Sequence, residues 1–358
     1  MSFDLSSFDR AYWQDRNVLV TGGASFIGSH LTDLLVELGA RVSVADDLSS
    51  GRRENLADQL ERDAITFHEV DLRDAESVRT VLTGVDTVFH LAAAHGGRGY
   101  VDLHQSACAE NLYLDGLVFR TAAGLGVDKV VFASSGCIYP LHIQGDLDSE
   151  LKLTEDLAGP PYNPDGMYGN AKLMGELTLR AMHQDTGLKA ASCRYFTVYG
   201  PRGIENHAVM AMMGRALVRQ SPFEIWGDGR QIRNWTHVYD IVRGTVLAGE
   251  RISDGSAVNL GTTERVTVLD AAQTICELAD HTAEFAFRTD MPVGPVNRVA
   301  DNTLAAELLG WTPQVPFAEG VRSTFAWYRA HRDPAVLGEV LESLLTSRGE
   351  HVPVLTGV

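Results

Sequence analysis

Two short segments of the chain combine residue types that could do chemistry together. Tyr168 and Lys172 are four residues apart, so on a helix the phenol and the ammonium share one face. A phenol has a pKa of about 10, and a neighbouring positive charge lowers that pKa by favouring phenolate. The second segment, residues 21–28, is a glycine-rich turn between an apolar strand pattern and a helical pattern, where backbone N–H groups can reach a pyrophosphate. Together the segments predict a bound dinucleotide beside a tyrosine base, and hence oxidation or reduction of an alcohol.

Two serines precede this pair. Ser134 and Ser135 end an apolar run that is typical of a buried strand. A hydroxyl at that place can share the proton of a substrate alcohol with the phenol. We therefore expect Ser135, Tyr168 and Lys172 to form a catalytic group.

Carboxylates at strand ends support a nucleotide cofactor. Asp46 ends the second strand pattern, 18 residues after Gly28, where a carboxylate can bind both hydroxyls of an adenosine ribose. The same charge would repel a 2′-phosphate, so the sequence favours NAD over NADP. Asp71 ends the third strand pattern and is expected to accept a hydrogen bond from the adenine edge. A helix cap or a loop carboxylate is the alternative role for Asp46, and a loop carboxylate is the alternative for Asp71.

Strand and helix patterns alternate over the first half of the chain. Strands are expected at residues 17–21, 41–46, 65–70, 87–91 and 129–133, and helices at residues 26–38, 75–82 and 107–125. This alternation predicts an α/β protein with a Rossmann-like, doubly wound parallel sheet and a smaller C-terminal α/β lobe.

The pattern becomes irregular after residues 199–201. We expect residues 1–199 to form an NAD-binding Rossmann domain to which residues 236–262 return. Residues 200–235 and 263–330 are expected to form a substrate-binding lobe. Residues 331–358 would be a C-terminal tail that carries one helix, at residues 334–345, and then frays.

Composition excludes several classes of protein. The net charge of −17 opposes binding to nucleic acid or to an anionic membrane, and an anionic substrate would need local arginine or lysine. No apolar run approaches the length of a membrane span, and the N-terminus lacks a signal-peptide pattern, so a cytoplasmic location is expected. The four cysteines, at positions 108, 137, 193 and 276, have no metal-ligand spacing, and no metal site is expected.

Many motifs in order carry a resemblance to a known family. They are residues 21–28, 46–48, 71–73, 90–93, 134–135, 168–172, 194–196, 199–201, 226–229 and Arg233. With them the chain resembles, from about residue 17 to residue 328, the extended short-chain dehydrogenase/reductase family, specifically its nucleotide-sugar epimerases and dehydratases. The resemblance implies that Tyr168 takes the proton and bound NAD the hydride from the hydroxyl on carbon 4 of the sugar. Return of the hydride leaves no net redox change.

The resemblance also implies the cofactor contacts. They would come from Gly22, Ser25, Phe26, Ile27, Gly28, Asp46, Asp71, Leu72, Leu91, Ala92, Ala93, Tyr168 and Lys172. Ser25 replaces the middle glycine of the phosphate turn. Its Cβ would crowd the pyrophosphate, or its hydroxyl would bond to it.

The fate of a 4-ketone depends on the groups beside carbons 3 and 5. Dehydratases of the family carry an Asp-Glu pair at the positions of Gly136 and Cys137, so dehydration is not expected here. Residues 134–140 instead resemble GDP-mannose 3,5-epimerases, whose matching cysteine is an acid/base group, which gives that role to Cys137. Their second acid/base is a lysine, and His207 aligns with it; an imidazole can do the same work near neutral pH. The alternatives are a small core residue for Cys137 and a solvated or capping residue for His207.

Substrate contacts are implied by the same resemblance. Gly97 and Arg98 belong to a glycine loop beside the sugar, together with Ser135 and with Thr197, which replaces the usual asparagine. Arg233 and Arg298 are expected to grip the nucleotide diphosphate, because a guanidinium fork suits phosphate. Surface ion pairing is the alternative for those two arginines, and solvent exposure is the alternative for Arg98.

The leading hypothesis is an NAD-dependent nucleotide-sugar epimerase of the GDP-mannose 3,5-epimerase type. The main alternative is a 4-epimerase of a GDP- or UDP-sugar, in which Cys137 has no catalytic role. A 4,6-dehydratase, a plain reductase and a non-catalytic NAD sensor are further alternatives. By analogy, the helices at residues 107–125 and 168–181 would pair with their copies in a homodimer.

Overall fold

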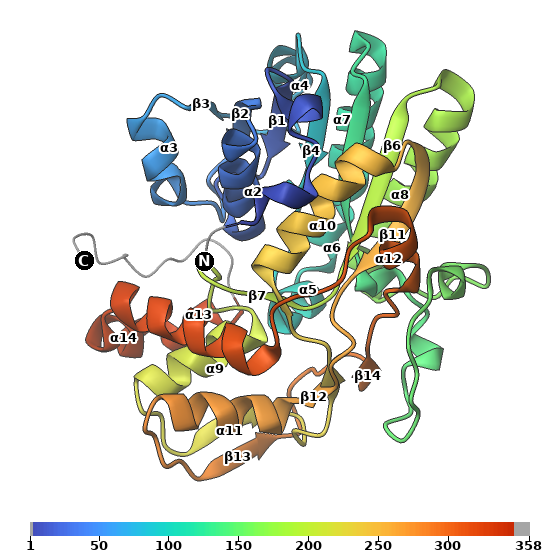
Figure 1. The fold of residues 1–358 in the computed structure, drawn as a ribbon. Helices are drawn as coiled ribbons and strands as arrows, with labels where there is room; N and C mark the ends of the chain where they lie inside the picture. Colours follow the sequence, from blue (N-terminus) through green and yellow to red (C-terminus); the bar gives the residue numbers. More distant parts are fainter. Residues whose placement is uncertain (1–2, 347–358) are drawn as a thin grey trace.

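A seven-stranded parallel sheet lies at the centre of the computed structural model, which describes residues 3–346 (Figure 1). The strand order is β11-β6-β5-β4-β1-β2-β3. The strands are β1 (Asn17–Thr21), β2 (Arg41–Asp46), β3 (Ile65–Glu69), β4 (Thr87–His90), β5 (Lys129–Ser135), β6 (Lys189–Tyr195) and β11 (Asp254–Leu260). Val18 of β1 is in register with Val42 on one side and Thr87 on the other. The predicted doubly wound sheet is confirmed.

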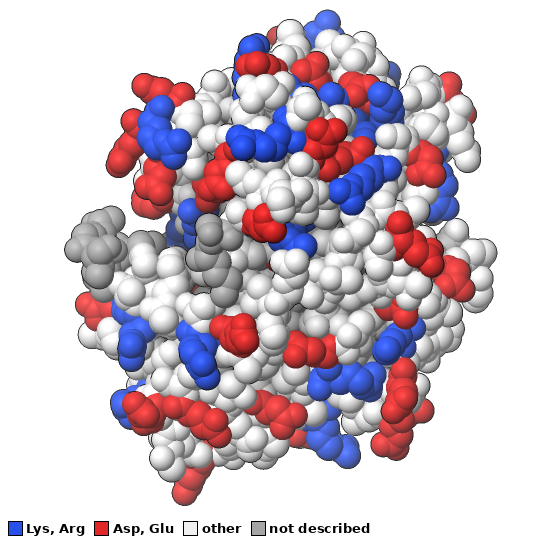
Figure 2. Space-filling model, in the orientation of Figure 1, with Lys and Arg blue, Asp and Glu red and all other residues white. Residues whose placement is uncertain are grey.

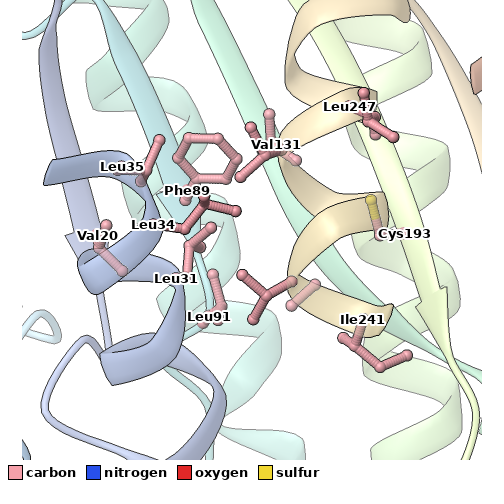
Figure 3. Packing of buried hydrophobic residues seen from close by; sticks show 14 of the residues in the cluster. Val20, Leu31, Leu34, Leu35, Phe89, Leu91, Val131, Cys193, Ile241 and Leu247 are labelled. Carbon is pink, nitrogen blue, oxygen red and sulfur yellow. The ribbon is translucent and has the colours of Figure 1, made fainter. Parts of the chain in front are cut away.

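Helices cover both faces of the sheet, which is why its central strands are almost continuously apolar. One face is covered by α2 (Phe26–Glu37) and α10 (Val238–Arg251), and Figure 3 shows their leucine and isoleucine side chains meeting the strand residues Phe89 and Val131. The other face is covered by α4 (Ala75–Leu82), α7 (Asn111–Leu125) and α8 (Gly166–Thr186). Leu31 and Leu34 of α2 are fully buried, and each such burial contributes about 1.5–3 kcal/mol.

The strand order creates a crevice at the carboxyl ends of β1 and β4. The chain leaves β1 toward β2 on one side, and β4 lies on the other side of β1. Such a topological switch point is where open parallel sheets bind nucleotides. The predicted phosphate turn and both predicted strand-end carboxylates lie at this edge of the sheet.

A second layer of structure lies below the sheet in Figure 1. It contains α9 (Ala208–Leu217), β8 (Phe223–Trp226), β9 (Ile232–Arg233), β12 (Val266–Thr267), α11 (Val268–Leu278), β13 (Phe285–Arg288), β14 (Asn297–Arg298), α13 (Phe317–His331) and α14 (Pro334–Leu344). These elements share one apolar cluster, which includes Met210, Ile275, Val321 and Leu337. The short parallel pair β7 (Val198–Tyr199) and β10 (Thr236–His237) also lies in this half of the chain. We refer to these elements as the lobe.

The remaining elements are short. They are α1 (Arg10–Trp13), α3 (Ala57–Glu61), α5 (Arg98–Leu103), α6 (Gln105–Ala109), α12 (Thr303–Leu309) and the 3-10 helices η1 (Leu5–Ser7), η2 (Arg53–Leu56), η3 (Gly136–Ile138), η4 (Leu141–Ile143) and η5 (Glu155–Ala158). No helix within residues 3–346 is long and apolar enough to cross a membrane. Figure 2 shows acidic and basic side chains interspersed over the face in view.

Two predicted element boundaries are wrong. A single helix was expected over residues 107–125, but α6 and α7 are separate and Glu110 lies between them. The start of α7 is held by tertiary contacts, because the Asn111 side chain accepts a hydrogen bond from the Ala94 N–H and donates one to its C=O. Strand β5 runs two residues further than expected, to Ser135.

The tail helix expected at residues 334–345 is α14. The Asp333 side chain caps it by accepting from the Ala335 N–H, and Pro334 occupies its first turn. Leu337 and Leu341 pack into the lobe cluster beside α9, so this helix is part of the lobe core. The expected fraying falls on residues 347–358, outside the described residues.

Candidate active site

Three adjoining pockets lie between the sheet edge and the lobe. The sheet pocket is lined by Gly22, Asp46, Asp71, Leu72 and Ala92, among others. The central pocket is lined by Phe26, Ile27, Ser135, Lys172 and neighbouring residues. The lobe pocket is lined by Gly97, Arg98, Arg215, Trp226 and Arg233, with others from the lobe.

Shared residues show how the pockets connect. Ser25, Leu91 and Ala93 line both the sheet pocket and the central pocket. The central pocket and the lobe pocket share Cys137, Tyr168, Thr197, His207 and Arg298. Of the predicted site residues, Gly28 is the one that lines none of these three pockets.

Close packing explains the glycines of the phosphate turn. Gly22 has φ +67°, and a Cβ on it would lie 2.9 Å from the Ala92 nitrogen. A Cβ on Gly28 would lie 2.2 Å from the Gly22 carbonyl oxygen, so Gly28 serves the packing of α2 against the turn. The Ser25 hydroxyl donates to the same Gly22 carbonyl at 2.5 Å. In this structure, therefore, the hydroxyl bonds to the turn itself.

The two strand-end carboxylates differ in how they are held. Asp46 accepts backbone N–H groups from Ala24 and Leu48, each at 2.9 Å, so its carboxylate has a defined position in the sheet pocket. Asp71 is paired with Arg73, whose Nη2 lies 2.8 Å from Oδ2, and the hydrogen bond from Arg73 lowers the pKa of Asp71. An adenine contact by Asp71 would therefore compete with an existing ion pair.

Helix α8 brings Tyr168 and Lys172 to the wall of the central pocket. The Lys172 Nζ lies 5.9 Å from the centre of the Tyr168 ring and 4.5 Å from the centre of the Phe132 ring. Burial raises the pKa of Tyr168, and a hydrogen bond with Ser135 opposes that rise. Burial lowers the pKa of Lys172, and the charge of Asp115 opposes that change. The protein alone thus disfavours phenolate, and a further positive charge beside the phenol would be needed to form it.

Ser134 and Ser135 point to different environments. Ser134 donates a hydrogen bond to the buried Glu176, which is also paired with Arg194 at 2.8 Å. Ser135 lines the central pocket, and its Oγ accepts the N–H of Cys137 at 3.1 Å. Both serines line the central pocket, but the Ser134 hydroxyl is bonded to Glu176, so Ser135 is the one whose hydroxyl we expect to reach a ligand.

Cys137 lies where the central and lobe pockets meet. It follows β5 in the short helix η3 and is half-buried, whereas Cys108, Cys193 and Cys276 are buried. Its Sγ accepts a hydrogen bond from Arg298 Nη1 at 3.2 Å. Cys137 is therefore not a buried core residue, unlike the other three cysteines.

His207 caps the start of α9 and borders the same two pockets. Its ring lies 5.9 Å, between centroids, from that of His95. The glycine loop packs on the preceding residue, because a Cβ on Gly97 would lie 1.7 Å from the Asn206 carbonyl oxygen. Burial lowers the pKa of His207 to about 4, so its imidazole is neutral at pH 7 and can accept a proton.

Burial of histidines predicts a loss of stability in mild acid. Burial lowers the pKa of His30 to about 3 and those of His207 and His237 to about 4, from 6.5. Between pH 6.5 and 5 the unfolded chain therefore binds more protons than the folded one, so stability falls as the pH falls. For each such histidine, the free energy of unfolding falls by about 1.4 kcal/mol for every pH unit below the pKa of the unfolded imidazole.

Thermal unfolding at pH 7, 6 and 5 checks this expectation. The Tm should fall across the series, and it should fall less in a His30→Asn variant because one titrating group is removed. A Tm that is constant between pH 6.5 and 5 would contradict it.

Arginines dominate the lobe pocket. Arg98, Arg215, Arg233 and Arg298 line it, and among its described lining residues Glu224 is the single carboxylate. Arg233 donates to the Ile232 and Val293 carbonyls, and burial and repulsion by Arg298 lower its pKa to about 9. These arginines are therefore not surface ion pairs. Four arginines thus gather around one pocket of a protein whose net charge is −17.

Arg98 and Arg298 meet at a carboxylate. Asp165 accepts from Arg98 Nη1 at 2.9 Å and from Arg298 Nη2 at 3.2 Å. Arg98 also pairs with Asp102 at 3.0 Å, so Arg98 is not a solvated side chain. The Arg298 guanidinium contacts protein through all three nitrogens, which leaves one further hydrogen on each terminal nitrogen for a ligand.

The sequence analysis missed Arg215. Its side chain is 4% exposed, and its Nε and Nη2 have no hydrogen-bond partner within residues 3–346. Burial lowers its pKa. A buried guanidinium without partners beside a pocket is typical of a ligand site, because leaving it unsatisfied is costly. The available signal was a single arginine within the otherwise apolar helix α9.

Replacement of Arg215 by methionine should have opposite effects on binding and stability. We expect KM for an anionic substrate to rise at least about tenfold, since a charge-assisted contact is lost. The Tm of the protein without substrate should rise, because an unpaired buried charge is removed. Steady-state kinetics and thermal melting measure both quantities. Arg219→Met, at an exposed position four residues further on, is the matched control, and an unchanged KM in Arg215→Met would contradict the role.

Comparisons with known proteins agree with this geometry. The model of the NAD-dependent epimerase/dehydratase family matches residues 18–261. GDP-mannose 3,5-epimerase 1 of Oryza sativa subsp. japonica is 32% identical over 325 residues, covering 89% of this chain and 83% of the relative. UDP-glucose 4-epimerase of Mycolicibacterium smegmatis is 33% identical over 322 residues, covering 87% and 98%.

Solved structures are similar over the same length. UDP-glucose 4-epimerase of Thermotoga maritima, solved with UDP-glucose, has a TM-score of 0.77 and 32% identity, covering 87% of this chain and 98% of that one. UDP-glucose 4-epimerase of Thermus thermophilus, solved with NAD, has a TM-score of 0.76 and 30% identity, covering 87% and 99%. The chain is therefore an enzyme of the NAD-dependent epimerase/dehydratase family, and its cofactor is NAD.

Proposed function

We propose that this enzyme epimerises a nucleotide-diphosphate sugar at carbon 3, carbon 5 or both, through a transient 4-keto sugar, as a GDP-mannose 3,5-epimerase does. The observation that carries the proposal is the place of Cys137. Its sulfur lies at the junction of the central and lobe pockets, with a guanidinium against it, and Tyr168 borders the same junction. A 4-epimerase needs no acid/base group there.

The cofactor would occupy the sheet pocket and the central pocket. Asp46 would bind the adenosine ribose, and the turn at Gly22 and Ser25 would face the pyrophosphate at the start of α2. The nicotinamide end would lie beside Phe26, Ile27 and Lys172. When bound there, NAD supplies the hydride acceptor and a positive charge beside Tyr168.

The proton steps are derived from the side chains around the junction. Tyr168 takes the proton of the hydroxyl on carbon 4, with Ser135 sharing it and Lys172 stabilising the phenolate. The resulting ketone acidifies the hydrogens on the adjacent carbons. Cys137 and His207 then remove and return a proton there, one as the base and the other as the acid.

The lobe pocket suits the rest of the substrate. Its arginines match a diphosphate, and Trp226 offers apolar surface to a nucleotide base. We therefore assign residues 200–235 and 263–330 to substrate binding and residues 1–199 with 236–262 to the cofactor. Gly97 and Thr197 would contact the sugar.

A dehydratase is disfavoured by packing. A Cβ on Gly136 would lie 3.2 Å from the Phe196 ring, so the aspartate that dehydratases carry at that position has little room. The second candidate is a 4-epimerase, which the 33% identity to the mycobacterial UDP-glucose 4-epimerase favours.

Turnover in heavy water separates the two candidates. Epimerisation at carbon 3 or 5 incorporates solvent deuterium, whereas 4-epimerisation returns the substrate's own hydrogen. The purified enzyme would be incubated with GDP- and UDP-sugars, and the products analysed by NMR and mass spectrometry. Epimerised product without deuterium would refute the proposal in favour of 4-epimerisation.

A homodimer is part of this proposal. Leu112 and Tyr113 of α7 and Met174 of α8 are between 43% and 58% exposed, on the two helices that the resemblance assigns to an interface. Sedimentation analysis should give twice the chain mass of 39.0 kDa. Charged substitutions at Leu112 and Met174 should give the monomer.

A further inference from the structure

Asp165 occupies the N-cap position of a helix, but its side chain makes unusual contacts for that position. It is the N-cap of α8, three residues before Tyr168, a position at which aspartate ordinarily accepts a hydrogen bond from the first turn of its own helix. Within the described residues its side chain makes no such bond. The carboxylate instead faces the arginines of the lobe pocket, and its side chain is 8% exposed.

The backbone around Asp165 is fixed to the cysteine turn. The Asp165 N–H donates to the Cys137 carbonyl at 2.8 Å. A Cβ on Gly169 would lie 2.3 Å from that same carbonyl oxygen, so the first turn of α8 packs directly on Cys137. The position of the Asp165 carboxylate relative to the sulfur is therefore defined.

The carboxylate joins two arginines that come from distant parts of the chain. Arg98, from the glycine loop, reaches Oδ2 at 2.9 Å and Oδ1 at 3.3 Å. Arg298, from β14, reaches Oδ2 at 3.2 Å. Arg233 lies close enough for Arg98 and Arg298 to lower its pKa by repulsion. Without Asp165, three guanidiniums would repel one another around the pocket.

The Arg298 guanidinium connects the Asp165 carboxylate to the Cys137 sulfur. Its Nε donates to Gln144 Oε1 at 2.8 Å and its Nη2 to Asp165, and these two contacts set the plane of the group. In that plane Nη1 lies 3.2 Å from Cys137 Sγ. A planar fork with two of its nitrogens held can present the third in one direction.

We infer that Asp165 is a positioning residue that holds Arg298 against the Cys137 sulfur and anchors Arg98 of the glycine loop at the same point. The inference deepens the proposed function, since its catalytic consequence depends on Cys137 acting as an acid/base group. The contact has a chemical consequence that can be measured without turnover, because a charge-assisted hydrogen bond at the sulfur changes the rate at which the thiol is alkylated.

Alkylation of Cys137 measures that consequence directly. The other three cysteines are buried, so iodoacetamide should label Cys137 first, and peptide mass spectrometry can track the site. Asp165→Asn should slow labelling at pH 7 about tenfold, because Arg298 is no longer held in place and its charge-assisted hydrogen bond to the reacting sulfur is lost. Equal or faster labelling of Asp165→Asn at pH 7 would overturn the inference.

Matched variants separate positioning from general damage. Asp102→Asn removes the other carboxylate on Arg98, does not touch Arg298, and should label like the wild type. Asp165→Glu keeps the charge and should restore labelling to within about threefold. Slow labelling in Asp102→Asn, or no recovery in Asp165→Glu, would count against the inference.

A double-mutant cycle tests whether Asp165 acts through Arg298. Arg298→Met should slow labelling as much as Asp165→Asn, and the double variant should show no further loss, since the two residues act as one unit. Additive losses would show an independent effect and overturn the inference. Arg298→Met leaves Asp165 in place, so it also supplies the comparison if Asp165→Asn folds poorly.

The inference and the proposed function can fail separately. Normal deuterium incorporation with undiminished labelling in Asp165→Asn would remove the inference and leave 3,5-epimerisation standing. Slow labelling in the variant, with no deuterium incorporation by the wild type, would confirm the contact and remove the proposed chemistry.

Discussion

Tyr168→Phe is expected to reduce kcat by about 10²–10⁴-fold, the usual contribution of a positioned general base. In the proposed mechanism the phenol of Tyr168, on the wall of the central pocket, takes the substrate proton, and phenylalanine has no hydroxyl with which to do so. Initial rates with saturating nucleotide sugar measure the loss. NAD released from the denatured variant should remain near one per chain, because the ring still packs in the pocket.

Tyr199→Phe is the control for this expectation. Tyr199 is equally a buried phenol, but its hydroxyl donates to the Phe317 carbonyl at 3.2 Å, inside the lobe. Its loss should cost about 1 kcal/mol of stability and leave kcat unchanged. Undiminished turnover in Tyr168→Phe would instead support a non-catalytic, NAD-binding role for the whole chain.

Cys137→Ala is expected to slow proton exchange at carbons 3 and 5 of the sugar while oxidation at carbon 4 continues. Removal of the thiol should slow exchange of the hydrogens on carbons 3 and 5 with solvent deuterium by about 10²-fold or more, because one of the two acid/base groups is lost. Oxidation at carbon 4 should persist, since Ser135, Tyr168 and Lys172 are untouched. The enzyme-bound nicotinamide would then be seen as reduced cofactor by its absorbance after substrate is added.

Cys276→Ala provides the comparison for that experiment. Cys276 is buried in the lobe core, away from the pockets, and its replacement should lower stability without changing exchange. Exchange at the wild-type rate in Cys137→Ala would leave Cys137 a bystander and return the protein to the 4-epimerases.

Local patterns were enough to predict which residues line the pocket at the edge of the sheet. The run before Gly22 is apolar because β1 is buried on both faces, and the glycines mark a turn in which a Cβ would clash. The alternation of strands and helices predicts a parallel sheet, and the order of a parallel sheet brings Asp46 and Gly22 to the same edge. Tyr168 and Lys172 share a helix face by their spacing alone. Each of these features depends on neighbours within a few residues or on a rule of topology.

The surroundings of the residues in the lobe pocket could not be predicted, because they are set by contacts between distant parts of the chain. Cys137 and Arg298 are 161 residues apart, and their hydrogen bond exists because β14 returns to the end of β5. The break between α6 and α7 arises from the bond of Asn111 to Ala94, which helical periodicity cannot report.

The sequence by itself therefore determined the sheet, the phosphate turn and the tyrosine-lysine pair, because strand burial, glycine geometry and helix periodicity are local. Only the tertiary structure decided what surrounds the thiol of Cys137 and the guanidinium of Arg215. Charge and solvation are set by whichever groups the fold brings within a few ångströms, however far apart they lie along the chain.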